Sequence, residues 1–269
     1  FNLVSLANNH TLDRGEKGVL ASLEYWNGKK GAVTTGSSLT AEKEKKIRFF
    51  RVNGISCAFL AYTTATNGLK APKGKEHYVS LYTPEKAKEE VASARKKADV
   101  VIVSMHWGSE YVFAPTAEQK KIAEHLASLG VSIVLGHHPH VVQPVAMVKS
   151  TLVVYSLGNF LSAQKELHKL VGLLVSLDVV KTEIRGETRI SFENVTGTLL
   201  YNPRRSPLGR YVVVPFDMLR ADILKEFPAV YKKYAAIVTG GGRVISMRAP
   251  ASLPPAKPRS PGKKGRTSK

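Results

Sequence analysis

The sequence predicts a layered α/β protein, and two observations lead to this fold class. Through the first 160 residues, short apolar runs typical of strands alternate with stretches whose apolar residues recur at helical spacing. After residue 169 the pattern changes to a succession of strands. This order favours two sheets packed between helices. The chain has 269 residues, enough for one large domain or two small ones with a buried core.

The first expected elements are a strand, a helix and a hairpin. Residues 3–7 are an apolar run typical of a buried strand. Residues 15–27 follow as a helix that carries four apolar residues on one side: Val19, Leu20, Leu23 and Trp26. Residues 47–52 and 55–62 are rich in β-forming residues, and the Asn-Gly pair between them indicates a tight hairpin turn. We expect an irregular surface loop over residues 63–82.

Two later helices have clear start signals. Thr83 and Pro84 combine a capping residue with a proline at the first helical position. Thr116 and Gln119 form a capping box, and the helix that they open ends before Gly130. Three continuous apolar runs are typical of strands covered on both faces: 100–105, 131–135 and 152–157.

The C-terminal part predicts more strands, one helix and a tail. The expected strands cover 170–180, 187–195, 198–201 and 211–215. A helix is expected over 218–236. Residues 250–269 contain five prolines and six basic residues, a composition typical of a disordered tail. We therefore expect a main domain over 1–215, a helical extension over 216–249 and a basic tail over 250–269.

The composition restricts the class of protein. No apolar run approaches the roughly 20 residues that a membrane-spanning helix needs. The single cysteine, Cys57, excludes an internal disulfide and a multi-cysteine zinc site, and we expect it in the core. Forty basic and 21 acidic residues give a net charge of +19. This charge favours a polyanionic neighbour, whether nucleic acid, an anionic envelope polymer or acidic lipid.

Five of the eight histidines lie in three short clusters, each just after an expected strand. The clusters hold the following residues: Asn9 and His10; His106 and Glu110; His137, His138 and His140. A fourth turn, which contains Asn159, occupies the equivalent place after its own strand. Because the carboxyl ends of neighbouring parallel strands meet at one edge, we expect these clusters to converge. The three isolated histidines are expected to pack rather than to bind: His77, His125 and His168.

The residue types in these clusters point to a metal site. His138 and His140 are one residue apart, so an extended segment could aim both at one ion. His106 could complete a set of three nitrogen ligands, and Asn9 offers an amide oxygen. His10 could approach a substrate instead, to protonate a leaving oxygen or to stabilise a transferred phosphoryl group.

Four motifs together resemble one known family. They are SLANNHTLD at 5–13, HWGSEY at 106–111, GHHPHV at 136–141 and YSLGNF at 155–160. They resemble the CapA/PgsA family of capsule or poly-γ-glutamate synthesis proteins, which are related to calcineurin-like metallophosphoesterases. The resemblance covers roughly residues 1–165. It implies a four-layer αββα sandwich, here incomplete at the N-terminus, with a two-metal site that takes divalent ions of the Mn, Zn or Fe type.

The resemblance also implies roles for the clustered residues. Asn9, His106, His138 and His140 match metal ligands, with His137 as an alternative to His138. His10 matches the catalytic histidine, and Glu110 and Asn159 support the site. The acidic motifs of the superfamily precede the Asn-His motif and are absent from this sequence. Asp13 follows that motif, and we expect it to cap the next helix.

Three functions follow as hypotheses. The first is a metal-dependent phosphoesterase or related hydrolase. The second is a non-catalytic assembly module that binds an anionic polymer such as poly-γ-glutamate. The third, nucleic-acid binding, has only the charge in its favour, because no nucleic-acid module is recognisable. The resemblance implies other capsule-synthesis membrane proteins as partners. It also implies an extracytoplasmic place at the cell envelope, tethered by an N-terminal anchor outside this sequence.

Overall fold

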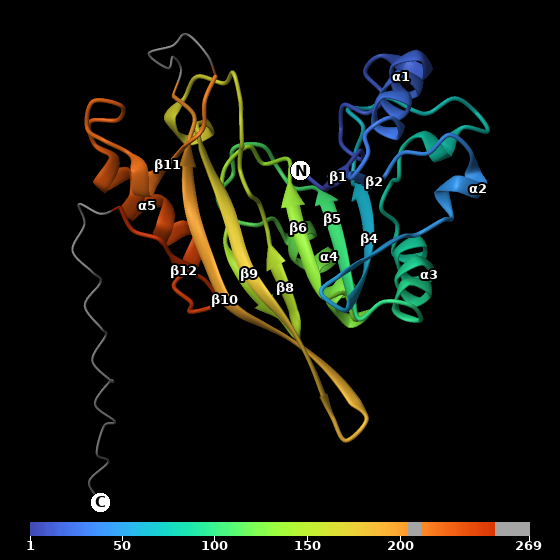
Figure 1. The fold of residues 1–269 in the computed structure, drawn as a ribbon. Helices are drawn as coiled ribbons and strands as arrows, with labels where there is room; N and C mark the ends of the chain where they lie inside the picture. The colour runs from blue at the N-terminus through green and yellow to red at the C-terminus, as the bar shows by residue number, and fades with distance from the viewer. Residues whose placement is uncertain (204–210, 251–269) are drawn as a thin grey trace, which may run out of the picture.

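The computed structural model describes residues 1–203 and 211–250, and it confirms the α/β fold class. Its largest unit is a six-stranded sheet with the strand order β3-β4-β5-β6-β8-β7 (Figure 1). The inner strands β4, β5, β6 and β8 are parallel, and β3 and β7 are antiparallel edges. In sheet order the strands are β3 Arg48–Val52, β4 Ile55–Thr63, β5 Val100–His106, β6 Ile133–His137, β8 Thr151–Val154 and β7 Val145–Val148.

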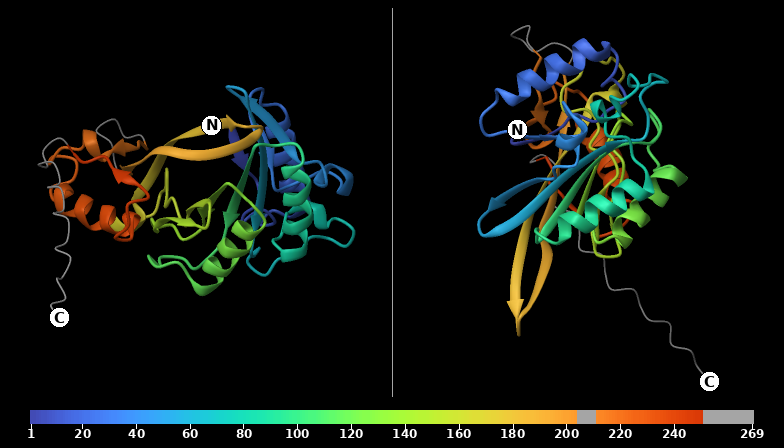
Figure 2. Two further views of the ribbon diagram at one scale, coloured as in Figure 1. Left: turned by 90° about the horizontal axis from the view of Figure 1, so that it is seen from below. Right: turned by 90° about the vertical axis from the view of Figure 1, so that its right-hand side faces the viewer.

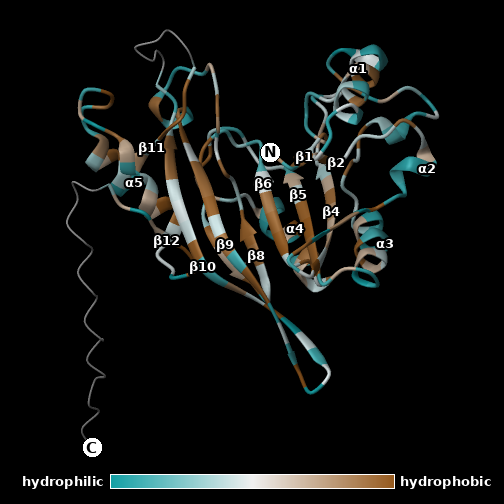
Figure 3. Cartoon of the chain, in the orientation of Figure 1, coloured by the Kyte–Doolittle hydropathy of each residue, from teal (hydrophilic) through white to brown (hydrophobic). Residues whose placement is uncertain are grey.

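Helices α3 (Pro84–Arg95) and α4 (Ala117–Ser128) cover one face of this sheet (Figure 2). Both predicted start signals are confirmed, because Thr83 accepts a hydrogen bond from the Lys86 N–H and Thr116 forms a capping box with Gln119. The α3 residues that face the sheet recur three or four positions apart, at helical spacing: Ala87, Val91 and Ala94. Strands β4, β5 and β6 are mostly hydrophobic, whereas the short helix α2 (Ala41–Glu44) is hydrophilic (Figure 3).

A long hairpin, β9 (Val171–Ile184) and β10 (Glu187–Tyr201), lies on the opposite face of the sheet (Figure 2). It forms a second sheet with β11 (Val214–Pro215) and β12 (Ser246–Met247). The two expected strands of its second arm are one strand, interrupted only by a register shift after Glu193. The two sheets meet through Cys57, Val100, Ile133, Leu177, Val179 and Phe192. The core position predicted for the cysteine is therefore confirmed.

The last helix, α5, covers Phe227–Thr239 rather than residues 218–236 as predicted. A helix that started at residue 218 would place Pro228 in its interior, where proline lacks the N–H and clashes with the preceding turn. In the structure Pro228 lies in the first turn, where that N–H is not needed. The buried face of α5 shares a core with β8 and with the β9–β10 hairpin. The predicted boundary between residues 215 and 216 stays a prediction.

The N-terminal segment forms a small parallel pair, β1 (Leu3–Ser5) and β2 (Val33–Thr35), with helix α1 (Gly15–Asn27) packed beside it. Leu20, expected on the inner side of this helix, is exposed, while Val19 and Leu23 are buried. Residues 63–82 are mostly irregular, but Tyr78 and Val79 are buried against α1, so this segment is not only a surface loop. The ends of β5 and β6 point toward β1 (Figure 1).

Two further sequence predictions concern the termini and the membrane. Among the described residues, no helix combines the length and the apolar character that crossing a membrane requires. The predicted basic tail over 250–269 lies outside the described residues except for Pro250. Its disorder therefore stays a prediction.

Asp99 joins the two sheets by electrostatics. One of its oxygens accepts hydrogen bonds from the Ser56 N–H (2.8 Å) and hydroxyl (2.6 Å), and the other lies 3.0 Å from the Lys181 Nζ on β9. The Ser56 hydrogen bonds, with a smaller contribution from Lys181, lower the pKa of Asp99 to about 2. The carboxylate therefore ties the start of β5 to β4 and to the hairpin.

We expect Asp99→Asn to lower the free energy of unfolding at pH 7 by about 1–2 kcal/mol, because charge-assisted hydrogen bonds are lost. The folded-state pKa lies below the roughly 3.9 of an unfolded aspartate, so this stabilisation is present above about pH 4–5 and disappears as the pH falls toward 2. Urea unfolding at several pH values measures the difference between variant and parent. Glu24→Gln, on the exposed side of α1, is the control. A difference that stays constant down to pH 2 would contradict this account.

Candidate functional site

The three histidine clusters converge at one edge of the fold, as predicted. The pairing of β5 with β6 sets His106 directly beside His137. Asn9 and His10 follow β1 and approach the same edge. A pocket of about 890 Å³ brings the candidate side chains together, and it is lined by Asn9, His10, His106, His137, His138, His140 and Asn159 among others. Much of the remaining lining is apolar, including Phe1, Leu3, Leu135 and Leu157.

Asn9 presents its amide oxygen to His106. The Asn9 Oδ1 lies 2.9 Å from the His106 Nε2, and Asn9 itself is buried. On its other side, the Asn9 amide nitrogen donates a hydrogen bond to the Asn67 Oδ1 at 3.1 Å. Asn67 was not predicted from the sequence. It orients the Asn9 amide so that the oxygen, not the nitrogen, faces the histidine.

His10 is held by Asp13. The Asp13 Oδ2 lies 2.7 Å from the His10 Nδ1, and since a carboxylate only accepts, the Nδ1–H donates to it. The prediction that Asp13 caps the following helix is wrong: α1 begins after Arg14 and has no side-chain capping bond. The three-residue spacing of His10 and Asp13 is the sequence feature from which this pair could have been predicted. With the proton on Nδ1, the His10 Nε2 is an acceptor, and it lies 3.4 Å from the Asn9 amide nitrogen.

The segment that carries His138 and His140 is bent rather than extended. Both residues have positive φ, 99° and 59°, so the extended segment predicted from their spacing is wrong. The bend nevertheless brings the rings together. The His138 ring lies 4.8 Å from the His106 ring and 6.2 Å from the His140 ring, between centroids. The His138 Nδ1 is buried and has no hydrogen-bond partner in the part of the chain that the structure describes, a costly state for a ring nitrogen.

His140 is oriented by its neighbours. Its Nδ1–H donates to the Asn159 Oδ1 at 2.9 Å, and its Nε2 lies 3.9 Å from a Glu110 oxygen. The Tyr111 ring stacks on the His140 imidazole at a centroid distance of 5.9 Å. The Lys169 Nζ lies 3.9 Å from the centroid of the same Tyr111 ring. Glu110 and Asn159 thus lie beside His140, and their supporting role stays a prediction. Tyr111 and Lys169 were not predicted.

Burial disfavours the charged form of three of the site's histidines, His106, His137 and His138. Burial, with smaller contributions from His138 and other neighbouring imidazoles, lowers the pKa of His106 to about 3. Burial alone lowers the pKa of His137 to about 4. Burial also lowers the pKa of His138, and the Glu110 carboxylate acts in the opposite direction. Neutral imidazole is the form that binds a metal ion.

These donors fit a metal ion in part. The His106 Nε2–H donates a hydrogen bond to the Asn9 Oδ1 at 2.9 Å, so the two atoms are close enough to share one ion once that proton is lost. The unpartnered His138 Nδ1 is a third donor. Within the described parts of the chain, however, no three His, Cys, Asp or Glu side chains are arranged to hold an ion together. The three candidate donors are thus two imidazole nitrogens and one amide oxygen, and none of them is a carboxylate oxygen.

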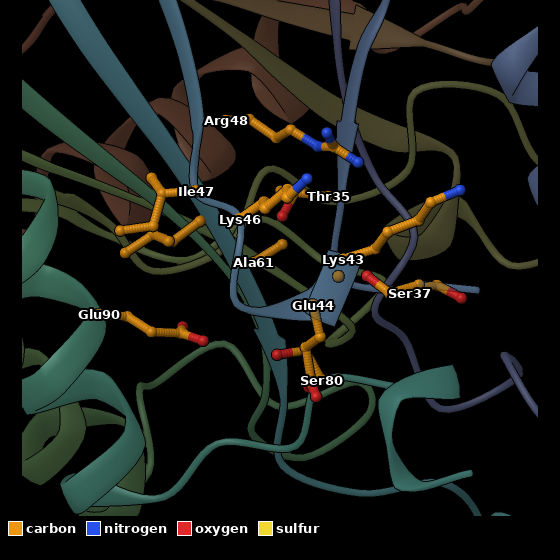
Figure 4. A pocket seen from close by; sticks show the side chains of 13 residues that line it. Thr35, Ser37, Lys43, Glu44, Lys46, Ile47, Arg48, Ala61, Ser80 and Glu90 are labelled. Carbon is orange, nitrogen blue, oxygen red and sulfur yellow. The ribbon is translucent and has the colours of Figure 1, made fainter. Parts of the chain in front are cut away.

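Other candidate features have structural roles. His125 bonds to the Tyr82 hydroxyl at 2.7 Å. A small cavity beside α2 is lined by Glu44 and Glu90 together with basic and hydroxyl side chains (Figure 4). It measures about 20 Å³, room for one water molecule. Its carboxylates already bond to Lys86 and to the Tyr62 hydroxyl, respectively. This cavity is too small for a substrate.

Comparisons with known proteins agree with the motifs. The PGA biosynthesis protein CapA of Bacillus subtilis (strain 168) is 32% identical over 234 residues, which cover 87% of this chain and 54% of that protein. The capsule biosynthesis protein CapA of Bacillus anthracis is 34% identical over 169 residues, 61% of this chain and 41% of that protein. The chain thus spans about half the length of the curated relatives it matches.

Among solved structures, the NAD nucleotidase of Haemophilus influenzae aligns with 92% of this chain and 42% of its own, at 15% identity and a TM-score of 0.44. The sequence profile of the bacterial capsule synthesis protein family PGA_cap matches residues 1–164, and these residues contain every candidate ligand and the His10–Asp13 pair. By this match and by its CapA relatives, the chain belongs to the bacterial capsule synthesis protein family PGA_cap.

Proposed function

We propose that this chain is the site-bearing part of a CapA-type protein of poly-γ-glutamate capsule synthesis or export, and that its site performs metal-dependent hydrolysis of a phosphoester or related bond. One observation carries the proposal: Asn9, His106 and His138 converge beside a histidine whose tautomer is held by a carboxylate. The names of the two CapA relatives support the capsule role. We also propose a place at the cell envelope, with other capsule-synthesis proteins as partners.

In this mechanism the chain's residues have separate tasks. The Asn9 Oδ1, the His106 Nε2 and the His138 Nδ1 would hold a divalent ion of the zinc, manganese or iron type. Such an ion supplies Lewis-acid polarisation and a nucleophile at neutral pH. Asp13 keeps the His10 proton on Nδ1, so the Nε2 can exchange a proton with the leaving oxygen once it carries one. Asn159 and Tyr111 hold His140 at the rim of the pocket.

A second function is favoured by two observations. The net charge is +19, and the described residues hold no complete group of metal-binding side chains. An assembly module that binds an anionic polymer without chemistry would need only the first of these properties. The two functions are distinguished by metal content and turnover.

We expect the chain to bind at most one transition metal tightly, and His106→Ala to weaken that binding at least tenfold, because loss of even an indirect partner of a ligand costs about 10–100-fold. Metal content after dialysis against buffered zinc or manganese, measured by plasma mass spectrometry, checks this. His77→Ala removes a histidine outside the site and is the control. Equal metal content in the parent and in His106→Ala would contradict the ligand assignment.

We expect His10→Ala to lower the turnover of the metal-loaded chain on bis(4-nitrophenyl) phosphate by about 10²–10⁴-fold, while the metal content stays near that of the parent. Asp13→Asn should lower turnover less, since it perturbs only the tautomer. If His10→Ala loses metal instead, His10 is a ligand. If the metal-loaded parent has no turnover but binds poly-γ-glutamate in a salt-sensitive way, the assembly module is the correct function.

A further inference from the structure

A second pocket is lined by His10 and by no other histidine of the described residues. It measures about 400 Å³ and lies between β1 and α1, with Arg14 and Ser22 from the helix side and Ser5 from the strand. Asn8, His10 and Trp26 line both this pocket and the larger one. Figure 1 shows α1 above β1 and β2. A molecule that reaches the histidines therefore has room to continue past His10 toward α1.

This pocket offers hydrogen-bond donors and no carboxylate. Arg14 is exposed, and its guanidinium has no ion pair or hydrogen bond within the described residues. The Asn8 oxygen is occupied by the His10 N–H, which leaves the Asn8 amide nitrogen available. No Asp or Glu is among the described residues that line it, because Asp13 turns to His10 instead. Apart from His10, Arg14 is therefore the one basic side chain among the described residues that line this pocket.

The first turn of α1 is built around the Arg14 side chain. A Cβ at residue 18 would lie 2.5 Å from the Arg14 Cβ, closer than two carbon atoms can approach. Glycine at this position lets Arg14 pack across the turn, although glycine in a helix costs about 0.5–1 kcal/mol relative to alanine. The indole of Trp26 forms an apolar wall of the same pocket.

We propose that this pocket, the Arg14 subsite, binds an oxyanion of the substrate, a carboxylate or a phosphate, in the position next to the bond on which His10 acts. The guanidinium presents paired N–H groups that match the two oxygens of such a group, and the indole contacts the attached aliphatic chain. The inference rests on the proposed function in giving His10 a substrate. Binding at Arg14 can nevertheless be measured without metal and without turnover.

The test uses the 269-residue chain, stripped of metal with EDTA, at low salt. The two probes are γ-linked tetraglutamate and inorganic phosphate, and the readouts are titration calorimetry and the fluorescence of Trp26. The other tryptophan, Trp107, is 1% exposed and does not line the pocket. We expect Arg14→Ala to weaken binding of the preferred probe about 10–100-fold, as for loss of a charge-assisted hydrogen-bond pair. The probe that depends more on Arg14 identifies the carboxylate or the phosphate as the ligand.

Three further variants make the test specific. Lys17→Ala removes the same charge from an exposed position of α1 that does not line the pocket, and should change affinity less than about twofold. Arg14→Lys keeps the charge but not the paired donors, and should fall between the parent and Arg14→Ala. Gly18→Ala should weaken binding without loss of charge, because it displaces Arg14, while circular dichroism reports whether α1 remains. Equal losses in Arg14→Ala and Lys17→Ala, or no loss in either, would overturn the subsite.

The two proposals fail in different ways. Arg14-dependent binding in a chain that hydrolyses nothing when loaded with metal would keep the subsite and contradict the hydrolase. Conversely, hydrolysis that requires His10 but whose KM and probe affinity are the same in Arg14→Ala would keep the hydrolase and overturn the subsite.

Discussion

The parallel pairing of β5 with β6 is the constraint on which the candidate site depends. Parallel strands end at the same edge of a sheet, and the observed register sets His106 opposite His137. A shift of one residue would turn every side chain of β5 to the other face and would bury His106 under α3 and α4. The apolar residues that hold the register, such as Val103 and Val134, are completely buried. The position of His106 and His137 at this edge is therefore fixed by the packing of apolar residues farther back along the two strands.

The candidate site also depends on strained backbone at this edge of the sheet. His138, His140 and Tyr111 all have positive φ, a conformation that costs about 1–3 kcal/mol at a residue with a side chain. Contacts between the two loops offset that cost. The Tyr111 N–H donates to the Pro139 carbonyl at 2.8 Å, and Asn159 bonds to His140. The bent loops bring three imidazole rings to one pocket, which an extended segment would not do.

The charge of the site contrasts with the charge of the chain. The whole sequence is strongly basic, yet the buried histidines are neutral, because their pKa values are lowered by burial. A neutral donor pocket inside a positive molecule is suited to a cation held by uncharged ligands and to an anionic substrate attracted from outside. The guanidinium of Arg14, which has no partner among the described residues, lines the same pocket as His10.

The sequence by itself determined the kinds of elements, most of their order and the edge at which the candidate side chains meet. Apolar periodicity and the capping residues Thr83 and Thr116 are local signals, so they predicted α3 and α4 correctly, whereas short strands such as β2 and β7 carry too few residues to show a pattern. Only the tertiary structure decided which atoms meet. Asn9 and His106 are 97 residues apart, and the partners of Asn9, His10 and His140 depend on loops whose paths no periodicity encodes. Local patterns report which face of an element is buried, but the contacts between side chains of distant segments are set by strand register and loop packing.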